Sequence, residues 1–342
     1  MTQLFRQLRK IEKNLGNIYN IFVSFSFHMF SLSSLPNDII RYIITFIPLQ
    51  SLAWSRALTL QSIKDNGGLE TTFFKKSPPF DVLNSLVGER TQTLILQDIN
   101  ENIFNNLYLL NMPNLKNLKI HGCYMSKVKS LEPLRDMRPK SLTLESFPYV
   151  KSLEPLRGMR PESLSLWCFP LVESLEPLRD MSPENLKLDY FPDVSSLEPL
   201  RGMRPKSLTL EYFFKVKSLE PLRDMRPKSL TLEVFRKVSS LEPLQGMCPK
   251  SLKLGHFMNV SSLEPLRDMR PEILYLSNFM DVSSFSPLQN MYPKILILLH
   301  FSQVLSLEPL LNMRPESWNI GCISQISEYE SNKFLTQLFS KN

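Results

Sequence analysis

The sequence predicts an α/β solenoid, in which short strands and short helical turns alternate along one array of coils. The first observation is that the phrase LxPL recurs every 22 residues from Leu131 to Leu307. A repeat period of 20–50 residues is typical of solenoids. The second is that each copy carries a pair such as Leu142 and Leu144, and a period of two indicates a strand with one buried face.

The rest of each copy predicts a short helical return. Leu131, Leu134 and Met137 are spaced by three, which suits a single helical or 3-10 turn. Pro133 can begin this turn because the first helical residues need no N–H donor. Pro139 ends it because proline disfavours helical backbone at the residue before it.

The strand pairs set the length of the array. We predict about eleven coils between residues 93 and 323, forming a nearly flat ribbon of about 50 Å at ~4.8 Å per strand. The first members of the pairs are Leu94, Leu118, Leu142, Leu164, Leu186, Leu208, Leu230, Leu252, Leu274, Leu296 and Trp318. Because a solenoid needs covered ends, we assign 66–92 to a linker and N-terminal cap holding one helix, and 324–342 to a C-terminal capping helix.

The repeats resemble a known family. Leu115, Leu118, Ile120 and Cys123 follow the pattern LxxLxLxxC, which with the period resembles leucine-rich repeats. The phrase SLEPL is similar to 22-residue internalin-type repeats, and PKSLTLESF is similar to FNIP repeats. The resemblance covers about 94–323. In eight successive copies, however, Phe stands where the family has Asn or Cys, which predicts an aromatic spine. These residues are Phe147, Phe169, Phe191, Phe213, Phe235, Phe257, Phe279 and Phe301.

Residues 32–65 resemble an F-box. Ile39, Ile43 and Ile47 lie on one face of a predicted helix. The segment LPNDII with a following Pro matches the first half of the family pattern, whereas RALTLQSIKD departs from its second half. The resemblance implies docking on the linker subunit of an SCF-type (cullin–RING) ubiquitin ligase, with no catalysis on this chain. The implied contacts are Leu35, Pro36, Ile39, Ile43, Ile47, Pro48 and Leu52.

Residues 1–31 form an N-terminal tail that we expect to be disordered or, if translation starts at Met29, untranslated. The basic residues before IFVSFSFHMFSL would also suit a targeting signal. Since this stretch is shorter than the ~20 apolar residues of a membrane helix, we predict no membrane span.

The amino-acid composition and the spacing of Cys and His disfavour a catalytic or metal site. The chain has 43% hydrophobic residues, four widely separated cysteines and a net charge of +7. Without CxxC pairs the cysteines predict a reducing compartment, so we expect a cytoplasmic protein, with the nucleus left open. We expect no metal and no cofactor, because no nucleotide-binding, hydrolase or metalloprotease motif occurs and His256 and His300 lie two coils apart.

A Glu column from Glu132 and Arg columns from Arg135 and Arg138 repeat along the array. We expect their charges to pair between stacked coils, which disfavours nucleic acid as the partner.

The predicted functional surface is the outward side of the strands. Outward positions differ between copies while the core positions stay fixed, as on a rigid binding surface, although neutral drift would leave the same pattern. We therefore expect an unidentified substrate protein to bind there. The candidate residues are Thr143, Trp167, Lys187, Asp189, Tyr190, Tyr212, Lys253, His256 and Tyr275.

Overall fold

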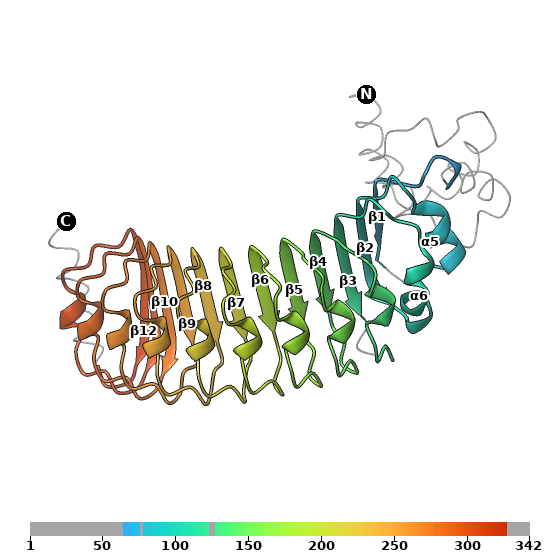
Figure 1. The fold of residues 1–342 in the computed structure, drawn as a ribbon. Helices are drawn as coiled ribbons and strands as arrows, with labels where there is room; N and C mark the ends of the chain where they lie inside the picture. Colours follow the sequence, from blue (N-terminus) through green and yellow to red (C-terminus); the bar gives the residue numbers. More distant parts are fainter. Residues whose placement is uncertain (1–63, 76–77, 123–126, 327–342) are drawn as a thin grey trace, which may run out of the picture.

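The computed structural model describes residues 64–75, 78–122 and 127–326. They form a solenoid around one 12-stranded sheet, in which all neighbouring strands are parallel and follow chain order (Figure 1). The predicted α/β solenoid is therefore confirmed. The strands are β1 (Thr71–Phe74), β2 (Thr93–Ile99), β3 (Asn117–Gly122), β4 (Ser141–Glu145), β5 (Ser163–Trp167), β6 (Asn185–Asp189), β7 (Ser207–Glu211), β8 (Ser229–Glu233), β9 (Ser251–Gly255), β10 (Ile273–Phe279), β11 (Ile295–Phe301) and β12 (Ser317–Ile323).

The strands occupy one long side of the solenoid and short 3-10 turns occupy the other, and the stack bends gently along its length (Figure 1). The turns are η2 (Leu107–Leu109), η3 (Glu132–Leu134), η4 (Glu154–Leu156), η5 (Glu176–Leu178), η6 (Glu198–Leu200), η7 (Glu220–Leu222), η8 (Glu242–Leu244), η9 (Glu264–Leu266), η10 (Ser286–Leu288) and η11 (Glu308–Leu310). Two α-helices, α5 (Phe80–Leu86) and α6 (Glu101–Asn105), lie near the N-terminal end. No helix among the described residues is long and apolar enough to cross a membrane.

Each coil is built from the same local choices. In β4, Leu142 and Leu144 are buried and Thr143 between them faces outward. Pro133 lies in the first turn of η3, as its fixed backbone angle favours. The Ser130 hydroxyl accepts a hydrogen bond from the Glu132 amide at 3.2 Å, a cap that later coils repeat at 3.1 Å. The serine of the phrase SLEPL therefore starts the turn, a role that the sequence analysis did not assign.

The predicted aromatic spine runs through the core. The eight phenylalanines from Phe147 to Phe301 are at most 1% exposed. Neighbouring rings stack with centroids 5.6–5.8 Å apart and interplanar angles of 7–18°. Phe104 of α6 extends the spine, with its centroid 5.4 Å from that of Phe147. Since offset stacked rings attract beyond their area burial, the spine joins each coil to both neighbours.

The N-terminal segment differs in one respect from its predicted role as a linker and cap. The predicted helix is α5, but residues 71–74 also form β1, which pairs with β2. This strand was missed because it lacks the Leu-x-Leu pair: Thr72 takes the core position opposite Leu94, and Phe74 the position opposite Leu96. The predicted tail (1–31), nearly all of the F-box-like segment (32–65) and most of the predicted C-terminal helix (324–342) lie outside the described residues.

We predict that Phe213→Ala lowers the free energy of unfolding by about 3–5 kcal/mol, because it leaves a cavity between two stacked rings. Phe213 is fully buried, with its ring 5.7 Å from Phe191 and 5.6 Å from Phe235. Denaturant unfolding followed by circular dichroism measures the change.

Phe214→Ala is the matched control for this prediction. Phe214 is only half-buried and contacts Arg236, Tyr190 and Tyr212 rather than the spine, so its loss should cost about 1–2 kcal/mol. Equal losses for the two variants would contradict a stabilising role for the spine.

Candidate functional site

The outward residues of the strands form three columns that run along the ribbon, one at the start, one at the middle and one at the end of each strand. Strand register aligns them from β3 to β11. The middle column contains Lys119, Thr143, Ser165, Lys187, Thr209, Thr231, Lys253, Tyr275 and Ile297. The column at the strand ends, called the exit column below, contains His121, Glu145, Trp167, Asp189, Glu211, Glu233, Gly255, Ser277 and Leu299.

The nine predicted binding residues fall on this face, between β4 and β10. Thr143, Lys187, Lys253 and Tyr275 belong to the middle column, and Trp167 and Asp189 to the exit column. Tyr190, Tyr212 and His256 directly follow the strands, next to the exit column.

The structure brings only some of these predicted residues together. Lys187 Nζ lies 3.5 Å from Asp189 Oδ2, and Lys253 Nζ lies 5.1 Å from the Tyr275 ring centroid. Thr143 lies two strands away from Lys187, whereas Trp167 is the register partner of Asp189. The Trp167 ring centroid is also 6.5 Å from that of His121.

Three consecutive strands place carboxylates side by side in the exit column. These are Asp189, Glu211 and Glu233. Asp189 was predicted to bind from the sequence, whereas the two glutamates were not. The repeat phase could have found them, because each lies 22 residues after the preceding carboxylate.

The ionised form of Glu211 is electrostatically unfavourable in this row. Burial raises its pKa, and the adjacent Asp189 raises it further, while Lys187 acts in the opposite direction. Asp189 is only 7% exposed, and its Oδ1 atom has no hydrogen-bond partner among the described residues. A carboxylate row with too few cations therefore lies at the centre of the strand face.

After Glu233, the next exit-column position is Gly255, which has no side chain. Lys253 Nζ lies 3.0 Å from Glu233 Oε1. Burial is the largest single influence and would lower the pKa of Lys253. The hydrogen bond to Glu233, together with the charges of Glu233 and Glu211 and the nearby Tyr275, raises the pKa overall. A Cβ atom at Gly255 would lie only 2.9 Å from Ser277 Oγ and 3.2 Å from Glu233 Oε1, so both polar atoms border the space above this glycine.

An aromatic cluster borders the exit column at β6–β8. The Tyr190 and Tyr212 ring centroids are 5.9 Å apart, and Phe214 lies edge-on to both at 6.4 and 6.2 Å. Arg236 places its guanidinium carbon 4.9 Å from the Phe214 centroid. Tyr190 and Tyr212 are 37% and 39% exposed, which leaves much of each ring open to solvent.

The tyrosines of this cluster have a left-handed backbone conformation, which directs their side chains outward. Glu211 faces outward and Phe213 inward, although residues two apart in a strand normally share a face. Tyr212 between them breaks the alternation with φ of +59°, as Tyr190 does with +63°. The amide of Tyr190 still donates to the carbonyl of Glu211 in the next coil, at 3.0 Å. Because single-residue propensities do not predict a left-handed tyrosine, this feature was missed.

The face becomes apolar near the C-terminal end. On β10 and β11 the outward positions include Ile273, Ile295, Ile297 and Leu299. Ile273 is 39% exposed and the other three are half-buried. The strand face thus changes along the ribbon from charged and aromatic to aliphatic.

The opposite face carries regular ion pairs. In coil after coil the Glu of SLEPL binds the Arg three residues on, for example Glu154 Oε1 to Arg157 Nε at 2.6 Å. These hydrogen bonds lower the pKa of Glu154 and raise that of Arg157. The expectation of pairing between coils is corrected: the main contacts lie within one coil, because one 3-10 turn places residues i and i+3 on the same side.

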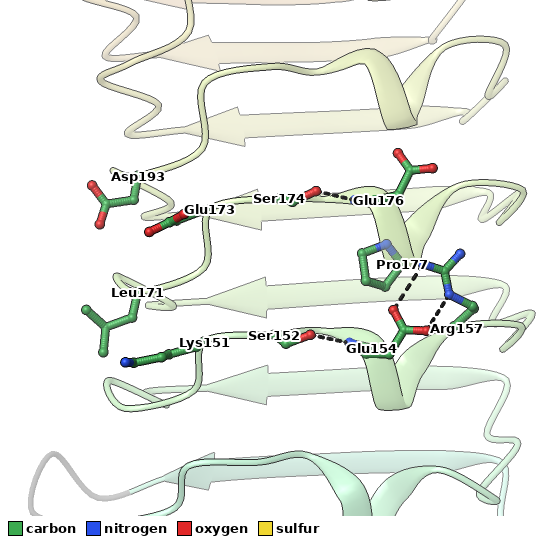
Figure 2. A pocket seen from close by; sticks show the side chains of 10 residues that line it. All are labelled: Lys151, Ser152, Glu154, Arg157, Leu171, Glu173, Ser174, Glu176, Pro177 and Asp193. Atoms are coloured by element: carbon green, nitrogen blue, oxygen red, sulfur yellow. Dashed lines mark hydrogen bonds and ion pairs between the residues drawn. The ribbon is translucent and has the colours of Figure 1, made fainter.

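A shallow depression lies between two of these coils on the turn side (Figure 2). Its polar lining includes the Glu154–Arg157 pair and Ser152, whose hydroxyl accepts from the Glu154 amide. These residues belong to the repeated phrase and recur in neighbouring coils, so the depression is a feature of coil stacking rather than a distinct site.

No group of three or more metal-ligating side chains occurs within the described ranges. Cys168 is buried, Cys248 and Cys322 are exposed, and none of the three is disulfide-bonded. Burial, with Asp189 nearby, raises the pKa of Cys168 above that of an ordinary thiol. Cys123 lies outside the described residues.

Comparison with models of protein families and with curated proteins finds no match to this chain. The class of protein is therefore defined by the fold: a leucine-rich-repeat-like solenoid whose strand face is chemically varied.

We predict that Glu211→Gln raises the thermal unfolding midpoint at neutral pH. The folded pKa of Glu211 is raised, so the folded state binds this proton more readily than the unfolded state, whose pKa is near the ordinary 4.5. The unfavourable contribution is fully present above the folded pKa and disappears as the pH falls below the unfolded pKa. Midpoints measured by circular dichroism should differ at pH 7.5 and converge below pH 4.5.

Glu242→Gln is the control, because Glu242 lies exposed on the turn side, where Gln245 replaces the usual arginine. It should leave the midpoint unchanged. A lower midpoint for Glu211→Gln at neutral pH would show instead that favourable contacts hold the ionised carboxylate.

Proposed function

We propose that this chain is a non-enzymatic recognition subunit that binds a partner protein through the strand face of its repeats. The contrast between core and face carries the proposal. Inward positions repeat Leu, Phe and Val in nearly every coil, whereas the outward ones change among Lys, Thr, Ser, Tyr and Ile. Such a scaffold holds varied side chains in fixed positions, as an extended binding surface requires.

The proposed role is that of a substrate adaptor in an SCF-type ubiquitin ligase. The F-box-like segment supports it, since Leu35, Pro36 and Ile39 match the part of that pattern that meets the ligase's linker subunit. The repeats would then hold a substrate protein near the ligase and raise its effective concentration there. We infer that no bond is made or broken on this chain.

Leu35→Ala combined with Pro36→Ala should abolish binding to a purified SCF linker subunit. Both substitutions remove apolar side-chain surface from the segment that matches the F-box pattern, and a few residues usually carry most of the binding energy of an interface. Co-purification of the full chain with the linker subunit measures the loss.

The circular dichroism spectrum and unfolding midpoint of the double variant serve as controls and should equal those of the wild type. If the variant still binds the linker subunit as well as the wild type does, the adaptor role is contradicted.

A second candidate function is a stand-alone scaffold with a degenerate F-box. It is favoured by RALTLQSIKD, which departs from the second half of the F-box pattern. In this case residues 32–65 would serve only as an N-terminal cap on the repeats.

Deletion of residues 32–65 separates the two functions. For an adaptor, we expect the denaturant midpoint of the repeats to stay within error of the wild type, because the deleted segment folds and binds separately. A large fall in the midpoint, together with absence of linker binding by the full chain, would favour the scaffold.

A further inference from the structure

We propose that the exit column from Asp189 to Ser277 binds an extended segment of the partner protein, with a lysine or arginine side chain of that segment between Asp189 and Glu211. This inference rests on the proposed strand-face recognition and names the chemistry of what is recognised.

The exit column has more carboxylates than lysines to pair with them. Asp189 and Glu233 each have a lysine nearby, with Lys187 at 3.5 Å and Lys253 at 3.0 Å. Glu211 between them makes no ion pair of its own within the described part of the chain, and its middle-column neighbours are Thr209 and Thr231. The charges of Lys187 and Lys253 act on it from the neighbouring strands, so three carboxylates share two lysines. A cation from outside the chain would complete the row.

Each end of this stretch has a buried polar atom without a hydrogen-bond partner among the described residues. Asp189 is 7% exposed with an unpartnered Oδ1, and Ser277 is 1% exposed with an unpartnered Oγ. Ser277 Oγ borders the space above Gly255, which Glu233 Oε1 also borders. Both oxygen atoms are covered by neighbouring groups in the free chain, so a partner's donors would reach them only after those neighbours move.

The aromatic cluster next to the exit column offers contacts for a cationic side chain. Tyr190 and Tyr212 directly follow Asp189 and Glu211 in the sequence, and their partly exposed rings lie 5.9 Å apart at the ends of the same two strands. Aromatic faces attract the aliphatic stems and cationic heads of Lys and Arg. Within the chain, Arg236 already packs its guanidinium over Phe214 of this cluster.

The length of the stretch fits a peptide. Asp189 lies on β6 and Ser277 on β10, four strand spacings apart, or about 19 Å at ~4.8 Å each. About six residues of extended chain span this distance. A metal ion is the weaker alternative, since the carboxylates do not converge with other ligands among the described residues.

The test measures fluorescence anisotropy of a labelled octapeptide of alternating glycine and lysine with the full chain at low salt. Because the chain carries a net charge of +7, a cationic peptide will bind only where local carboxylates attract it. We expect binding by the wild type, about tenfold weaker binding by Glu211→Gln and by Asp189→Asn, and unchanged binding by Glu242→Gln. The unfolding midpoint of each variant shows that it is folded.

Two outcomes would overturn the inference: no binding of the glycine–lysine peptide by the wild type, or equal binding by the wild type and both exit-column variants. Binding of a glycine–glutamate octapeptide that Lys187→Gln abolishes would retain strand-face recognition and reject only the cationic occupant. Linker-subunit capture depends on residues 32–65 and on no exit-column residue, so the adaptor role stands or fails separately.

Discussion

The structure depends on one constraint: no coil can bury its own apolar edges. Leu142 and Leu144 pair in register with Leu164 and Leu166, and the Phe147 ring stacks on Phe169. Each coil is thus covered only by its neighbours, and stability accumulates along the array. Because the same core side chains recur, every coil takes nearly the same shape, and the outward side chains are held in register across the sheet.

The same constraint explains the bend at each strand end. Phe213 must turn inward to join the spine while Glu211 stays outward, so the residue between them adopts a left-handed conformation. This conformation is costly for tyrosine and persists because the stacked coils determine it on both sides. As a consequence, Tyr190 and Tyr212 lie partly exposed at the strand ends rather than in the core.

Charged side chains are paired on the turn side of the solenoid but incompletely paired on the strand face. On the turn side, Glu154 and Arg157 satisfy each other within one coil at the exposed surface, where ion pairs contribute little. On the strand face, carboxylates of three neighbouring coils adjoin, and burial together with Asp189 raises the pKa of Glu211. An arrangement that costs stability without a partner is a common property of binding sites.

The period, the Leu-x-Leu strands, the proline-marked turns and the phenylalanine spine follow from the sequence alone, because each is a local pattern that recurs at 22 residues. The sequence also placed Lys187, Asp189 and Tyr212 on the outward face. Only the tertiary structure decided that β1 joins the sheet, that Glu154 pairs within its own coil, and that Glu211 makes no ion pair of its own among the described residues. These depend on strand register and backbone direction between coils, which set the distances between side chains far apart in the chain.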